Sequence, residues 1–493
     1  MQKTSNFQVY NASAGSGKTF TLVKEYLKIL VQSSDVFQFQ KILAITFTNK
    51  AAAEMKSRVL ENLEAFSRGE ENVYLHTILA ETTLGKEVIA LKSFKIFNAI
   101  LKNYAAFSVI TIDSFTHKII KSFAFDLGLS LNFEVEMNPK RLLTEAVDIV
   151  LSKIGVDEKM TQLLIDFSLE KIDNDTSWDI SHELNDISRI LLSEKDTKHF
   201  RKLEHKRIED FLVLKKELQK STKKIENEFA KLGNEVLSFV KDKGLVNSDF
   251  SYQDFPNHFI KYTNLKFLKI GAIKFENSRL YKGITDDKNL HGGKASSNSK
   301  SIIEGFKEEL ISYYKDSKLL FDDLYESYQF QKLALKSIVP LAVLNSINLE
   351  LSTLKEENNI RLNAEFNQLI SDNIKEQPAP FIYERIGQKF QYYFIDEMQD
   401  TSVLQWQNLI PLVTNALAQE NSNLMLVGDA KQAIYRWRGG EASQFINLGT
   451  AIVHETPSFF GAKEVKLLET NYRSYTEVIN FNNQFFQHLS GFL

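Results

Sequence analysis

A loop near the N-terminus combines residue types that suit the binding of a nucleoside triphosphate. Residues 11–20 read NASAGSGKTF, after an apolar segment of strand length and before a helical pattern. Small residues in such a loop let backbone N–H groups turn towards phosphate oxygens, and the following helix presents its positive end to them. Lys18 would reach the β and γ phosphates, and the Thr19 hydroxyl would bind Mg²⁺. The predicted nucleotide site consists of Ala14, Gly15, Ser16, Gly17, Lys18 and Thr19.

Two adjacent carboxylates far along the chain are the groups that a phosphate loop needs for hydrolysis. The segment YYFIDEMQD (392–400) places Asp396 and Glu397 at the end of an apolar strand. Asp396 can hold Mg²⁺, and Glu397 beside it can polarise the attacking water. Simple nucleotide kinases and small GTPases have no room for so long a separation from Lys18. The spacing therefore predicts an inserted domain between the two halves of the site.

Both ends of the chain contain short apolar segments that end in polar or glycine residues and precede helical patterns. They are FQVYNA (7–12), KILAITFT (41–48), FSVITIDS (107–114), YYFIDE (392–397), NLMLVGD (423–429) and VKLLETN (465–471). Strands that alternate with helices form parallel sheets, and their ligands bind at the carboxyl ends of the strands. The predicted fold is therefore α/β, with a parallel sheet flanked by helices.

The middle of the chain consists of long helical patterns rich in Lys and Glu. The clearest is HFRKLEHKRIEDFLVLKKELQKSTKKIENEF (199–229), with apolar residues three or four positions apart. By its Gly, Ser and Asn content, HGGKASSNSKS (291–301) is predicted to be a loop. We predict that residues 1–125 and 381–493 form the α/β domain and that residues 126–380 form an all-helical insert.

Composition excludes several classes of protein. The chain has 43% apolar and 25% charged residues, which is typical of folded proteins. It contains no cysteine, which excludes disulfides, thiolate metal sites and iron–sulfur clusters. The N-terminal segment MQKTSNFQVY lacks the pattern of a signal peptide, and we identify no continuous apolar run of membrane-spanning length. We therefore expect a cytoplasmic protein with no membrane partner.

Five further segments, taken in order, carry a resemblance to a known family. They are ITFTNKAAAEM (45–55), TIDSF (111–115), FIDEMQDTS (394–402), LVGDAKQAIYRWRGGE (426–441) and LETNYRS (468–474). With the phosphate loop, they resemble the motifs of UvrD/Rep-like superfamily 1 DNA helicases, and the loop ASAGSGKT (12–19) resembles the RecB/AddA-like branch. The resemblance implies a RecA-like P-loop domain with a helical insert, and an ATP-dependent DNA helicase or translocase of 3′-to-5′ direction.

The resemblance also implies roles for three residues around the nucleotide. Gln432 corresponds to the family glutamine that senses the γ-phosphate of ATP. Arg473 corresponds to an arginine that binds the same phosphate, and Tyr472 to an aromatic residue that stacks on adenine. Together with Glu397, Gln432 and Arg473 are the predicted catalytic residues.

A second set of residues is implied to bind single-stranded DNA. Phe47 and Trp437 match aromatic residues that contact bases, and aromatic faces beside cations suit sequence-tolerant binding. Either aromatic residue could instead belong to the hydrophobic core. Asp113 stands where the family commonly has histidine, so its role is left open. The predicted DNA-binding residues are Phe47, Thr48, Asn49, Ser114, Trp437 and Arg438.

The net charge of −3 gives no general sign of nucleic-acid binding. Between residues 196 and 225, however, ten Lys and Arg stand against five Asp and Glu. This stretch could attract DNA phosphates, or it could be a solvated helix face. The sequence leaves both interpretations open.

The chain continues for only about twenty residues beyond Arg473. In the family, ATP lies between two motor domains, so we expect this chain to contain the first motor domain and its insert, and to hydrolyse ATP weakly and unwind no DNA alone. The resemblance implies single-stranded and tailed duplex DNA as partners. A further implied partner is a second subunit of the helicase–nuclease.

Three other functions compete with this one. A non-catalytic, helicase-like scaffold subunit of a DNA repair complex would be expected to lose Lys18 or the Asp396–Glu397 pair, and all three residues are present. A phosphotransferase for a small molecule would not need Phe47, Trp437 or the NYRS segment. A metalloenzyme is disfavoured because the nine histidines show no paired ligand spacing.

Overall fold

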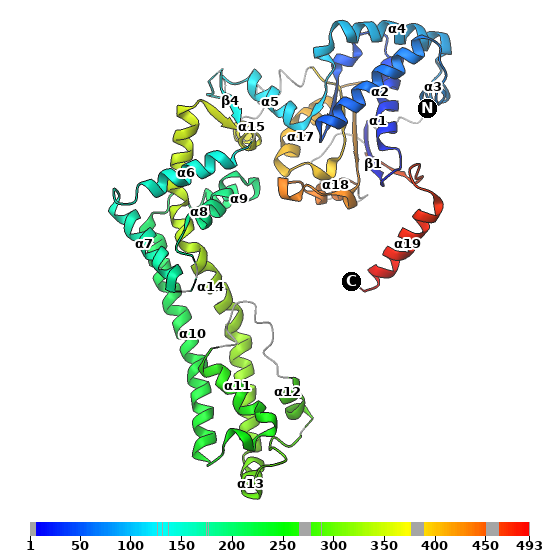
Figure 1. Cartoon of the computed structure of the whole chain (residues 1–493). Coiled ribbons are helices and arrows are strands. Elements are labelled where there is room, and N and C mark those ends of the chain that lie inside the picture. The colour runs from blue at the N-terminus through cyan, green and yellow to red at the C-terminus, as the bar shows by residue number, and fades with distance from the viewer. Residues whose placement is uncertain are drawn as a thin grey trace. The chain divides into compact units, whose positions relative to one another are not determined.

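A six-stranded parallel sheet forms the centre of the α/β part of the chain (Figure 1). The computed structural model describes residues 6–125, 127–130, 132–136, 138–173, 175, 177–265, 278–286, 288–375, 389–449 and 463–492. The strands are β1 (Phe7–Ala12), β2 (Ile42–Thr46), β3 (Val109–Thr111), β6 (Tyr392–Ile395), β7 (Asn423–Gly428) and β8 (Lys463–Leu468). Each predicted segment contains or overlaps one of these strands, which confirms the predicted fold class.

The strand order β3-β2-β6-β7-β1-β8 places strands from opposite ends of the chain next to one another. Ile45 of β2 is in register with Ile395 of β6, and Tyr10 of β1 is in register with Val427 of β7. All neighbouring strands of this sheet are parallel. As a result, the loops that carry the predicted site residues all emerge at the carboxyl ends of the strands.

Helices cover both faces of this sheet. On one side are α1 (Lys18–Gln32), α2 (Asn49–Ser67), α3 (Val73–Glu81) and α4 (Lys86–Lys102). On the other side are α5 (Ile112–Ser122), α15 (Phe366–Lys375), α17 (Val403–Leu417) and α18 (Ala442–Gly449). A further helix, α19 (Thr476–Ser490), follows β8.

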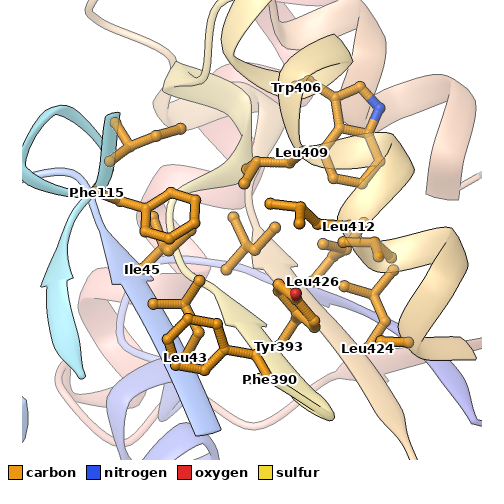
Figure 2. Packing of buried hydrophobic residues seen from close by; sticks show 14 of the residues in the cluster. Leu43, Ile45, Phe115, Phe390, Tyr393, Trp406, Leu409, Leu412, Leu424 and Leu426 are labelled. Atoms are coloured by element: carbon orange, nitrogen blue, oxygen red, sulfur yellow. The ribbon is translucent and has the colours of Figure 1, made fainter. Parts of the chain in front are cut away.

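The strands bury side chains on both faces because successive residues point in opposite directions. Leu43 and Ile45 belong to one core cluster, whereas Ile42 and Ala44 belong to the other. Figure 2 shows the first cluster, where strand residues such as Leu426 face Trp406, Leu409 and Leu412 of α17. Each fully buried side chain of this size stabilises the fold by about 1.5–3 kcal/mol.

By its internal contacts, the chain divides into two compact units. Unit 1 comprises Met1–Pro139, Leu192–Lys198 and Lys355–Leu493, and unit 2 comprises Lys140–Leu191 and His199–Leu354. The predicted domain boundaries at residues 126 and 380 lie outside the described residues and stay predictions. Unit 1 also contains a small parallel pair, β4 (Glu134–Glu136) with β5 (Ile360–Leu362), which the sequence did not predict.

Within its described residues, unit 2 contains helices and no strand. They are α6 (Lys140–Ser152), α7 (Glu158–Asp173), α8 (Ser181–Ser188), α10 (Ile208–Asp242), α11 (Asp254–Thr263), α12 (Ser278–Thr285), α13 (Ser297–Gly305) and most of α14 (Lys307–Glu357). The short α9 (Glu194–Phe200) begins in unit 1. The predicted loop 291–301 is wrong in its second half, because the Ser296 hydroxyl accepts a bond from Ser299 N–H and starts α13.

Helix α14 is the one described helix that is long and apolar enough to cross a membrane. Half of its apolar 18-residue window is buried inside the protein. Since the core helix of a folded unit meets the same criteria, α14 is weak evidence for a membrane span.

Candidate functional site

The predicted phosphate loop connects β1 to α1 in a conformation that only glycine adopts easily. Gly15 and Gly17 have φ angles of +79° and +87°, in the left-handed region. Gly17 is the N-cap of α1, so Lys18 and Thr19 lie in its first turn. The buried Ser16 hydroxyl has no hydrogen-bond partner among the described residues. This local geometry fits a loop that wraps an anion.

Lys18 brings together predicted residues from the ends of three strands. Its Nζ lies 3.1 Å from both carboxylate oxygens of Glu397 and 3.2 Å from Oε1 of Gln432. Glu397 follows β6, and Gln432 lies in the short helix η9 (Ala430–Gln432) that follows β7. Because β6 and β7 are adjacent strands, residues more than 370 positions from Lys18 reach its ammonium group.

Asp396 and Glu397 are consecutive carboxylates that interact directly. The Glu397 N–H donates to Oδ1 of Asp396 at 3.0 Å. Burial and the neighbouring Glu397 charge raise the pKa of Asp396 to about 7, although Lys18 and the Glu397 N–H act in the opposite direction. A divalent cation would compensate such a pair of charges, so the residues fit the predicted Mg²⁺ site. Glu397 also has a φ of +51°, which is uncommon for a residue with a side chain.

Two residues with no predicted role hold this pair in place. Gln399 donates to Oε2 of Glu397 at 2.7 Å and accepts from Asp429 N–H at 3.0 Å. Asp429 in turn accepts from the side chain of Gln432 at 2.7 Å. A Cβ at Gly428 would lie only 2.7 Å from the Gln399 oxygen, so a larger residue there would displace Gln399. Gln399 and Asp429 belong to the motif segments 394–402 and 426–441, but the sequence did not indicate which residues they would contact.

Tyr472 and Arg473 lie beside the phosphate loop, as their predicted roles require. Tyr472 N–H donates to the carbonyl of Gly15 at 2.9 Å. A side chain at Gly15 would lie 2.7 Å from Cβ of Arg473, so only glycine permits this approach. Both side chains are exposed, with Tyr472 at 78%.

Asn471 makes the contact that fixes this segment, although the motifs gave it no role. Its Nδ2 donates to the carbonyl of Ala14 at 3.1 Å. Its Oδ1 accepts from the N–H groups of Arg473 and Ser474 at 2.8 and 3.0 Å. One amide therefore ties the phosphate loop to the turn that carries Tyr472 and Arg473. The sequence feature that could have indicated this role is the position of Asn471 directly before Tyr472 and Arg473 in the NYRS segment.

Asn471→Asp is expected to weaken ATP binding roughly tenfold. Aspartate keeps the two bonds accepted by Oδ1, but it loses the donor to Ala14 and adds a negative charge beside the loop, a loss of about 1.5 kcal/mol. The measurement is equilibrium binding of a fluorescent ATP analogue. Asn98→Asp is the matched control, because its amide also donates to a carbonyl, in an exposed part of α4. Equal affinity of the two variants would contradict the role of Asn471.

Four side chains from two loops form an aromatic and cationic cluster. The ring centroids of Phe47 and Tyr435 lie 4.3 Å apart, and those of Tyr435 and Trp437 lie 6.2 Å apart. The Arg438 guanidinium is 5.8 Å from the Phe47 ring and 5.7 Å from the Trp437 ring. Trp437 is 78% exposed, so it is not a core residue, and Phe47 is half-buried. Tyr435 had no predicted role, although it stands two positions before Trp437 in the segment YRWR (435–438).

The other predicted DNA-binding residues lie at the starts of two helices. Thr48 caps α2 by accepting from Ala51 N–H at 3.1 Å, and exposed Asn49 is the first residue of that helix. Ser114 is exposed in the first turn of α5, and its hydroxyl lies 2.7 Å from that of the N-cap Thr111. These helices follow β2 and β3, so the three residues lie at the carboxyl ends of the strands, as the phosphate loop does.

Asp113 contacts protein groups. Gln405 donates to its Oδ1 at 3.1 Å. Burial raises the pKa of Asp113, while the nearby Arg438 charge and the Gln405 bond lower it. Asp113 is therefore a partly buried carboxylate close to a residue of the aromatic cluster.

Comparisons with known proteins agree with the motifs. The family model of the UvrD/REP helicase N-terminal domain matches residues 2–451. The chain is 24% identical to an ATP-dependent helicase/nuclease subunit from Listeria welshimeri, over 99% of the chain and 38% of that protein. It is 24% identical to the protein of the same name from Lysinibacillus sphaericus, over 98% of the chain and 38% of the relative. For the Clostridium kluyveri protein the values are 26%, 97% and 37%.

The chain thus spans less than two-fifths of the length of these relatives. The family match covers most of the described α/β part, including the phosphate loop, the carboxylate pair and the aromatic cluster. These matches confirm the resemblance inferred from the six motifs. The chain belongs to the UvrD/REP helicase N-terminal domain family.

Proposed function

We propose that this chain is the ATP-binding motor part of a DNA helicase or translocase that moves 3′ to 5′ and acts within a helicase–nuclease. One observation carries the proposal. The ammonium group of Lys18 lies within 3.2 Å of both Glu397 and Gln432, so a phosphate-binding cation, a candidate general base and an amide meet at one point. That combination suits hydrolysis of a terminal phosphate.

Each residue of the site has a distinct part in this reaction. The phosphate loop and Lys18 bind the β and γ phosphates of ATP, and Tyr472 stacks on the adenine. Thr19 and Asp396 would hold Mg²⁺, which would neutralise charge on the phosphate oxygens. Glu397 orients the attacking water and accepts its proton. Gln432 and Arg473 bind the γ-phosphate oxygens.

A short segment links the ATP site to the aromatic cluster. Gln432 in η9 and Trp437 in η10 (Arg436–Arg438) are only five positions apart. Between them, the N–H groups of Ile434 and Tyr435 donate to Asp400 at 3.2 and 3.3 Å. Asp400 belongs to the same motif as Glu397. We infer that this segment transmits a change in the position of Gln432 to Trp437 and Arg438, which would couple hydrolysis to movement along DNA.

The partners follow from this proposal. Single-stranded DNA would lie on Phe47, Tyr435 and Trp437, with the tail of a duplex as its source. The relatives are named as subunits of a helicase/nuclease, which supports a second helicase–nuclease subunit among the partners. A cytoplasmic location is part of the same proposal. Residues 1–125 and 381–493 would form the motor domain, with 126–380 as its insert.

A non-catalytic scaffold subunit is the alternative. Such a subunit has no need for a phosphate-loop lysine that is bonded to Glu397 and Gln432. The experiment that separates the two functions is ATP hydrolysis by the complete protein, with and without single-stranded DNA. Stimulation of ATP hydrolysis by DNA would support the motor function. Absence of ATP hydrolysis would support the scaffold function instead.

Trp437→Ala is expected to weaken oligonucleotide binding about 5- to 150-fold, because base stacking contributes about 1–3 kcal/mol per base. Trp437 is exposed, so its removal leaves the core intact. Fluorescence anisotropy of a labelled single strand is the measurement. Trp178→Ala is the matched control, since Trp178 is 70% exposed in unit 2. An unchanged Kd for Trp437→Ala would remove this residue from the DNA site.

A further inference from the structure

A pocket of about 430 Å³ lies along strand β3, which is at one edge of the sheet. One wall is a face of α2, and the other consists of β3 with the first turn of α5 and the short helix η2 (Tyr104–Ala106). Its lining residues are Asn49, Ala52, Ala53, Lys56, Ser57, Leu60, Tyr104, Val109, Ile110, Thr111 and Ser114. Two of them, Asn49 and Ser114, are predicted DNA-binding residues, so the pocket is continuous with that surface.

The described lining of the pocket contains a lysine and no carboxylate. Lys56 is half-buried, and its Nζ lies 5.1 Å from the centroid of the Tyr104 ring and 6.0 Å from that of Phe107. No ion pair of Lys56 occurs among the described residues. Burial and the nearby Lys118 charge lower the pKa of Lys56.

The acidic residues of α2 nearest the pocket are engaged elsewhere. Glu54 pairs with Arg58 at 2.7 Å, and Glu61 accepts the Ser57 hydroxyl at 2.7 Å. Ser57 is thus unavailable as a free donor. The Ser114 hydroxyl is likewise engaged, with that of Thr111 at 2.7 Å, so the exposed Asn49 amide is the polar side chain that can accompany Lys56.

We propose that this pocket receives a phosphate group of the bound single strand and that Lys56 neutralises it. An anion fits better than a stacked base, because the Lys56 ammonium already lies over the Tyr104 ring. The small side chains of Ala52 and Ala53 leave room for the sugar–phosphate backbone. This inference rests on the proposed DNA-binding function and extends the bound strand beyond Phe47 and Trp437 to the edge of the sheet.

The test is the salt dependence of oligonucleotide binding by Lys56→Met, which keeps the aliphatic stem over Tyr104 and removes the charge. Each neutralised phosphate of a single strand contributes about 0.7 to the slope of log K against log salt concentration. We expect the slope to fall by about 0.7, and the affinity to fall about fivefold at ~0.1 M salt. Lys56→Arg should retain both values. Lys95→Met, an exposed lysine of α4 outside the pocket, is the matched control.

The possible outcomes separate this proposal from the function on which it rests. Normal binding and an unchanged slope for Lys56→Met would overturn the pocket alone. Failure of the unmodified protein to bind oligonucleotide would overturn the DNA-binding function and the pocket with it. A titration with dTMP distinguishes the strand from a free phosphate: binding of dTMP that depends on Lys56, with oligonucleotide binding independent of it, would show a mononucleotide site and overturn the proposal.

Discussion

Glu397→Gln is expected to slow ATP hydrolysis by about 10²-fold or more while ATP still binds, because removing a general base costs about that factor. Glutamine keeps the shape of the side chain, and its one oxygen, placed where Oε2 of Glu397 lies, can accept from both Lys18 and Gln399. It cannot take a proton from water, so the loss falls on the chemical step. The measurement is single-turnover hydrolysis by the complete protein, together with equilibrium ATP binding.

Glu420→Gln is a suitable control for this variant, because Glu420 is an exposed carboxylate of the same unit. Its rate should equal that of the unmodified protein. If Glu397→Gln instead lost nucleotide affinity and kept its rate, Glu397 would be a binding residue, and the roles of Asp396 and Glu397 would have to be exchanged.

Lys18→Ala is expected to weaken binding of ATP·Mg²⁺ by about 10²-fold or to abolish hydrolysis. The lysine provides charge-assisted hydrogen bonds to the phosphates, each worth about 1.5–3 kcal/mol. The variant also removes the ammonium that lies 3.1 Å from Glu397, so the negative charges of Asp396 and Glu397 repel the ATP phosphates more strongly. Isothermal titration with ATP·Mg²⁺ and steady-state turnover give the two values.

Lys95→Ala, at an exposed position on α4, controls for the loss of a lysine in the same unit. Thermal unfolding of both variants separates binding from folding. Unchanged turnover in Lys18→Ala would contradict the assignment of the phosphate loop.

The elements of the α/β part could be predicted from local patterns. An apolar run such as residues 423–428 reads as a buried strand because both of its faces are covered by helices. The glycines of the phosphate loop were informative because left-handed φ angles occur at Gly15 and Gly17. The carboxylates after β6 could be placed near the phosphate loop because the carboxyl ends of parallel strands lie on the same side of the sheet.

Weak local signals account for the errors. Strands β4 and β5 have three residues each, which is too short for an alternating pattern. Serine near residue 296 suited both a loop and a helix N-cap, and the cap was realised. Neither outcome can be decided without the surrounding packing.

The sequence by itself determined the strands, the phosphate loop and the family, because these depend on residue type and short spacing. Only the tertiary structure decided which distant groups meet. Asn471 reaches Ala14 because β8 pairs with β1, and Gln432 reaches Lys18 because β7 lies between β6 and β1. Tyr435 packs on Phe47 through loops that follow non-adjacent strands, β7 and β2. Such contacts depend on strand order, which is set by the free energy of packing the whole sheet and not by any local pattern.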